Sequence, residues 1–179
     1  MTAFIDRLDH PGIRAFYAFW LAKRGRRKVP SRTDFDPVEL KPYLPHLFMI
    51  DVVGMPARFR YRLCGIAVAA IYGEFTGAWV DEFLPANFRE VALARLADAA
   101  ENLHVHYLVQ RLTWQDRPYV RYRRLLMPLS DDQVRANILL GVVYADAEAD
   151  TSVHARAPLD AVNIIEDLSA RWNAADASP

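Results

Sequence analysis

The sequence predicts an α+β fold in which helices cover one face of a five-stranded antiparallel sheet. Apolar and alternating segments at residues 47–53 and 58–64 indicate two strands, and segments at 105–114, 119–130 and 134–145 indicate three more. The residues between these two groups have helical patterns, and strands grouped in this way favour the α+β class. An N-terminal amphipathic helix is expected before the sheet, and a short C-terminal helix after it.

The composition fits one folded domain. The chain has 179 residues, of which 53% are hydrophobic, too many for a disordered chain. Its 22 basic and 22 acidic residues balance, so no net field draws it to nucleic acid or to an anionic membrane. The lone Cys64 can close no intrachain disulfide, the N-terminus lacks a signal-peptide pattern, and charges interrupt every apolar run. We therefore expect a cytoplasmic protein with no membrane segment.

Residues 11–24 predict the amphipathic helix at the N-terminus. Pro11 suits its first turn, and Gly25 can adopt the left-handed conformation that ends a helix. A basic, proline-containing connector follows, and the helix and connector together form a first region of residues 1–34. The apolar side chains recur at the spacing of one helical face: Ile13, Phe16, Tyr17, Trp20 and Leu21.

The main region, residues 35–147, opens with a short helix at Asp36 and the apolar strand 47–53. In residues 58–64 charged and apolar residues alternate, which predicts a half-buried strand paired with the first as a hairpin. The alternation places Arg58, Arg60 and Arg62 on one face of the sheet and Phe59, Tyr61 and Leu63 on the other.

Helical turns are predicted next, followed by an alanine-rich helix over residues 85–102. Turn signals at 116–118 and 130–132 then separate the last three strands, which predicts an antiparallel meander. The third region, residues 148–179, has near-helical apolar spacing over residues 158–172, so we expect a helix there and a frayed tail after it.

Three stretches of the chain resemble one branch of PAS-like proteins that is common in alphaproteobacteria: the Trp20 helix with KRGRRKVPSR, then DFDPVELKPYLPHLFMIDV, then RFRYRLCGIAVAAIYGEFTGAWVDEF. The resemblance covers residues 16–145. It implies a stand-alone PAS module, and PAS domains in general act as sensors or dimerisation platforms coupled to a signalling partner. The chain has no room for a kinase or DNA-binding output module, so we expect output to pass through another protein.

The resemblance also implies two kinds of site. PAS-type folds often enclose a small-molecule pocket, although a plain filled core is the alternative at each position; the candidate lining residues are Tyr61, Phe75, Trp79, His106, Trp114 and Tyr122. In PAS-like proteins an N-terminal helix commonly packs on or beside the sheet and helps to build a homodimer. The candidate interaction residues are therefore Phe16, Trp20, Leu21 and Arg60, the alternative for Arg60 being a solvated outer face.

Other chemistry is weaker in the sequence. His104 and His106 would project from one strand face, which leaves open a small α+β enzyme or a haem or metal-binding domain. No nucleophile elbow, phosphate-binding loop or zinc-protease motif is present, so we predict a non-enzymatic module whose cofactor, if any, is unknown. The basic run at residues 23–28 has no recognition motif beside it, so we do not expect nucleic-acid binding.

Overall fold

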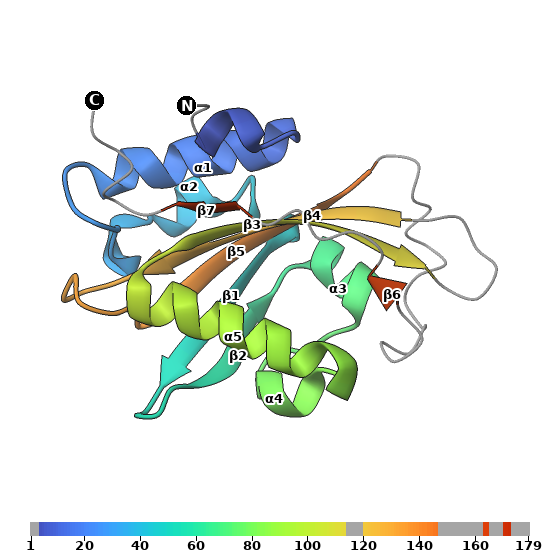
Figure 1. Ribbon diagram of the computed structural model, residues 1–179. Helices are drawn as coiled ribbons and strands as arrows, with labels where there is room; N and C mark the ends of the chain where they lie inside the picture. The colour runs from blue at the N-terminus through green and yellow to red at the C-terminus, as the bar shows by residue number, and fades with distance from the viewer. Residues whose placement is uncertain (1–3, 114–119, 147–162, 165–169, 173–179) are drawn as a thin grey trace.

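The computed structural model describes residues 4–113, 120–146, 163–164 and 170–172 (Figure 1). Short 3-10 turns lie at η1 (Phe4–Arg7), η2 (Arg32–Asp34) and η3 (Leu44–His46). The helices are α1 (Pro11–Arg24), α2 (Pro37–Leu40), α3 (Ile66–Tyr72), α4 (Val80–Phe83) and α5 (Ala86–Asn102). The strands are β1 (Leu47–Val53), β2 (Arg58–Cys64), β3 (Val105–Thr113), β4 (Val120–Leu129), β5 (Ile138–Ala145), β6 (Asn163–Ile164) and β7 (Ala170–Trp172).

All strand pairs of the sheet are antiparallel, in the order β2-β1-β5-β4-β3-β6, with β7 also pairing with β3. The predicted hairpin of β1 and β2 and the predicted meander of β3, β4 and β5 are both confirmed. The long-range pairing lies between β1 and β5, where Phe48 is opposite Gly141. This pairing joins the hairpin and the meander into one sheet.

The predicted C-terminal helix is wrong wherever that segment is described. Asn163–Ile164 and Ala170–Trp172 are short strands on the outer side of β3, with Ile164 opposite Leu112 and Trp172 opposite Val105. An open sheet edge presents unpaired backbone N–H and C=O groups. Pairing with β3 satisfies these groups on β3 and on the two short strands. Residues 158–162 and 165–169 and the predicted frayed tail lie outside the described residues.

Helices lie on both faces of the sheet (Figure 1). Helices α3, α4 and α5 cover one face, as predicted, and α1 covers the other. The side chains of Ile13, Phe16 and Trp20 are completely buried there. The Trp20 indole N–H donates a hydrogen bond of 3.3 Å to the backbone carbonyl of Pro128 in β4. The amphipathic helix therefore buries its apolar face within its own chain.

An ionic cluster around the buried Arg123 fixes the start of α1 to the sheet. Arg123 in β4, only 8% exposed, donates from Nε to Asp9 Oδ1 at 2.7 Å and also pairs with Asp146. The Tyr107 hydroxyl donates to the same Asp9 carboxylate. Burial of Asp9 acts to raise its pKa, but the hydrogen bonds from Arg123 and Tyr107 hold that pKa below its usual value. Asp9 is therefore a firm anchor for the helix that follows.

Replacing Trp20 with alanine removes the largest side chain between α1 and the sheet. We expect Trp20→Ala to lower the free energy of unfolding by about 3–5 kcal/mol, because it deletes a buried ring and leaves a cavity. Val38→Ala is the control, since Val38 is 75% exposed, and should change stability by less than about 0.5 kcal/mol. Urea unfolding, monitored by far-UV circular dichroism so that the signal does not depend on tryptophan, measures the stability of both variants. Equal urea midpoints for the two variants would contradict the described packing of α1.

Candidate functional site

Alternation along β4 assigns its side chains to two different layers. Tyr122 faces α3, since its ring centroid lies 6.1 Å from that of Tyr72 at the end of this helix. Arg123 faces the opposite layer, where it meets Asp9. Successive side chains of a strand point to opposite faces, so Arg124 shares the face of Tyr122. The layer between the sheet and α3 to α5 thus receives both an aromatic residue and a cation from β4.

Three aromatic rings pack together at the β2 end of this layer. The centroid of Tyr61 lies 4.2 Å from that of Phe75 and 5.8 Å from that of Phe83, and the latter two are 5.2 Å apart. The segment after α3 runs along β2, because Gly77 N–H donates to the Tyr61 carbonyl at 2.7 Å and Tyr61 N–H to the Ala78 carbonyl at 2.9 Å. This backbone pairing places Phe75 against Tyr61.

Two polar atoms in this layer are buried without a hydrogen-bond partner among the described residues: the Tyr72 hydroxyl and Arg124 Nε. Burial raises the pKa of Tyr61 to about 12, while the charge of Arg124 acts to lower it and Tyr72 to raise it, so these three groups are close enough to interact. Burial likewise raises the pKa of Tyr72. We call this group of side chains the core site: Tyr61, Tyr72, Phe75, Phe83, Tyr122 and Arg124.

Only some of the residues predicted to line a pocket belong to the core site. Tyr61, Phe75 and Tyr122 do, and all three are buried. Trp79 instead lies at the outer edge of β2, where the Arg58 guanidinium sits 4.2 Å from its ring centroid. Trp114 lies outside the described residues. Sequence reasoning missed Tyr72, Phe83 and Arg124, although the period-two alternation of β4 does place Arg124 on the Tyr122 face.

The two histidines converge on a carboxylate that sequence reasoning missed. Asp98 in α5 lies 3.0 Å from His104 Nδ1 and 2.7 Å from His106 Nε2. Burial acts to raise the pKa of Asp98, but hydrogen bonds from Asn102 and His104 and the charges of both histidines hold it below its usual value. Among the residues that the structure describes, no cluster of His, Cys, Asp or Glu is arranged to hold a metal ion. Both histidines therefore bind Asp98 of α5.

The predicted interaction residues are divided between interior and surface. Phe16 and Trp20 are buried, Leu21 is half-buried and Arg60 is exposed. Arg60 lies on the solvated arginine face of β2, and the neighbouring Arg62 pairs with Asp51 at 2.8 Å. In the basic run, ion pairs join Lys23 to Glu39 and Arg27 to Asp34, each at 2.6 Å.

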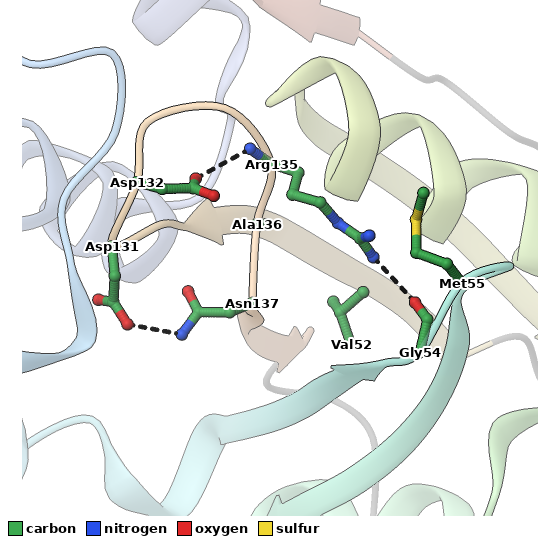
Figure 2. Close-up of a pocket in the computed structure, with 8 residues that line it drawn as sticks. All are labelled: Val52, Gly54, Met55, Asp131, Asp132, Arg135, Ala136 and Asn137. Atoms are coloured by element: carbon green, nitrogen blue, oxygen red, sulfur yellow. Dashed lines mark hydrogen bonds between the residues drawn. The ribbon is translucent and has the colours of Figure 1, made fainter.

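A pocket of about 460 Å³ lies between the β1–β2 turn and the loop from β4 to β5 (Figure 2). Arg135 reaches across it and donates to the Gly54 carbonyl at 3.2 Å, and the Asn137 amide donates to Asp131 at 2.9 Å. Asp132 accepts hydrogen bonds from the backbone N–H groups of Val134 and Arg135, at 2.8 and 3.2 Å. These polar groups hold the loop itself in place.

Cys64 is a neutral thiol. Burial, with a smaller contribution from Glu74, raises its pKa to about 11, and only the thiolate is an effective nucleophile.

No helix in the described part of the chain has the length and apolarity needed to cross a membrane.

Comparison with known proteins gives one match. A family model described as a PAS domain matches residues 8–144, from just before α1 to the end region of β5. No curated protein and no solved structure matches the chain. The matched range includes α1, all five long strands and the core site.

The Asp98 cluster predicts a specific response to acid. The pKa of Asp98 is lower in the folded state than in the unfolded state. The Asp98 carboxylate therefore contributes its full stabilisation of the fold above the unfolded-state pKa, near 4, and this contribution is lost as the pH falls through the folded-state pKa. Asp98→Asn should therefore lower the free energy of unfolding by about 1–3 kcal/mol at neutral pH. It should also make the free energy of unfolding depend less on pH in the acidic range. Urea unfolding across pH tests it against Glu101→Gln, an exposed change in the same helix; identical acid profiles for both variants would refute the role of Asp98.

Proposed function

The chain belongs to the PAS domain family, whose members serve in general as sensory or signalling modules, and we propose that it acts in signal transduction through a separate partner protein. The match over residues 8–144 is the observation that carries this proposal. The resemblance of the Trp20 to Phe83 stretch to alphaproteobacterial PAS proteins supports a bacterial, cytoplasmic module. A fold alone does not identify a signal, so the rest of the proposal depends on the sites.

The proposed role is non-enzymatic. PAS domains are typically sensory rather than catalytic. The core site brings together aromatic rings and a guanidinium, and the nearby Cys64 thiol stays protonated, its pKa raised to about 11. Most covalent catalysis needs a nucleophile, a base and a residue that orients the base. The described side chains of the core site do not form such a set.

The core site supports binding of a small molecule. Small-molecule sites are lined mainly by apolar and aromatic side chains with a few polar groups that fix orientation. Aromatic rings from β2, β4, α3, α4 and the segment after α3 meet this description, and the Tyr72 hydroxyl and Arg124 supply the polar groups. The ligand would occupy the layer between the sheet and helices α3 to α5, where its binding can alter how these helices pack.

A thermal-shift screen with NMR mapping tests this binding. We expect at least one small metabolite to raise the melting temperature, by the equivalent of about 2.7 kcal/mol at one hundred times its dissociation constant. The ligand should shift NMR signals of Tyr61, Phe75 and Tyr122, and Met55→Ala, in the pocket between the β1–β2 turn and the β4–β5 loop, should leave its affinity unchanged. Ligand shifts confined to Met55 and Arg135 would contradict the assignment to the core site.

We also propose that the module forms a homodimer through the outer face of the β1–β2 hairpin. Val53, 43% exposed, and the exposed Arg60 lie on this face beside the Asp51–Arg62 ion pair. Arginine and apolar side chains are enriched at protein interfaces. Because Phe16 and Trp20 pack inside the chain, this surface replaces them as the proposed contact.

Sedimentation equilibrium tests the proposed dimer. Val53→Asp should weaken dimerisation at least tenfold, because it places a carboxylate in the contact, and Val38→Asp on the exposed surface of α2 is the control. A wild-type protein that sediments as a monomer, or a Val53→Asp variant as dimeric as the control, would argue against this surface.

A further inference from the structure

Arg123 and Arg124 are adjacent in β4 and differ in their partners. Arg123 is paired with two carboxylates, those of Asp9 and Asp146. On the opposite face, no carboxylate in the described part of the chain pairs with the half-buried Arg124, and its Nε is buried without an acceptor there. A cation removed from water is costly unless a negative group accompanies it. Within the described residues, Arg124 therefore lacks the counter-charge that its neighbour has.

The Tyr72 hydroxyl adds a second unpaired donor in the same layer. A buried donor left without an acceptor costs the full free energy of its desolvation. The charge of Arg124 acts on the pKa of Tyr72 and of Tyr61, which agrees with the placement of all three groups around one position. Both groups can donate hydrogen bonds, so a ligand that satisfies them must present an acceptor.

We propose that Arg124 and Tyr72 bind the carboxylate of a small, otherwise apolar ligand, an inference that depends on the proposed small-molecule binding at the core site. A guanidinium donates to the planar carboxylate with matched geometry, and the tyrosine hydroxyl can donate to one of its oxygens. The neighbouring Tyr61, Phe75 and Phe83 rings, which pack against one another, would contact the apolar body of the ligand. Arg124 supplies one positive charge, which balances a monocarboxylate and falls short of a phosphate dianion.

A matched ligand series tests the proposal. The probes are straight-chain carboxylates from butyrate to decanoate, each compared with the alcohol of the same chain length, measured by thermal shift and by isothermal titration calorimetry. Wild-type protein should bind its best carboxylate roughly tenfold or more tightly than the matched alcohol, since the hydrogen bonds of the carboxylate are made to charged donors.

Three variants locate the effect. Arg124→Met keeps an apolar stem without the charge and should abolish the preference for the carboxylate, while leaving the affinity for the alcohol nearly unchanged. Tyr72→Phe should reduce the preference several-fold. Arg26→Met, an exposed change after α1, is the control and should keep the full preference. Far-UV circular dichroism and urea unfolding establish that each variant is folded before its binding is compared.

The outcomes separate this inference from the function on which it depends. Equal affinity for carboxylates and alcohols in the wild type would support a small-molecule site and overturn the carboxylate assignment. If Arg124→Met still prefers the carboxylate to the alcohol, another cation must bind the carboxylate. That result would also overturn the assignment to Arg124. If no probe of any chain length binds, the carboxylate assignment fails, and the metabolite screen decides separately whether the core site binds another ligand.

Discussion

The central strands β4 and β5 are covered on both faces, and the rest of the structure depends on this double burial. Every residue of these strands must suit either the α1 layer or the layer of α3 to α5, and alternation decides which. Gly141 in β5 shows how tight the fit is, since a Cβ atom there would lie 2.1 Å from the Phe48 ring of β1. Any side chain at this position would therefore have to displace the buried Phe48 ring.

Double burial also determines how the charged groups of β4 behave. A polar group between two packed layers cannot depend on water, so it needs a partner within the protein or from a ligand. On the α1 side, Asp9 and Asp146 provide that partner for Arg123, and the ionic cluster attaches α1 to the sheet. On the other side Arg124 and Tyr72 adjoin aromatic rings. Ion pairs thus close one layer, and in the other, as far as the chain is described, two hydrogen-bond donors have no acceptor.

The local features of the fold were predictable, and the features that depend on distant contacts were not. The helix over residues 11–24, its ends and the β1–β2 hairpin follow from spacing and turn residues. The partnership of Asp98 with His104 and His106 was missed, because it crosses from a helix to the following strand and has no simple spacing rule. The C-terminal helix was predicted wrongly because helical spacing in a short apolar segment carries little weight against an open strand edge.

By itself the sequence determined the α+β class, the alternation of β2 and the amphipathic face of α1, because each depends on neighbours a few residues apart. It also placed Tyr61, Phe75 and Tyr122 among the candidate ligand contacts. Only the tertiary structure decided that Trp20 packs inside the chain and that Trp79 stacks on Arg58 outside the core site. It also decided that Arg123 is paired with two carboxylates, while Arg124 meets none among the residues that the structure describes. Those outcomes depend on which face each layer covers and on which distant carboxylates arrive there, and no local pattern encodes either.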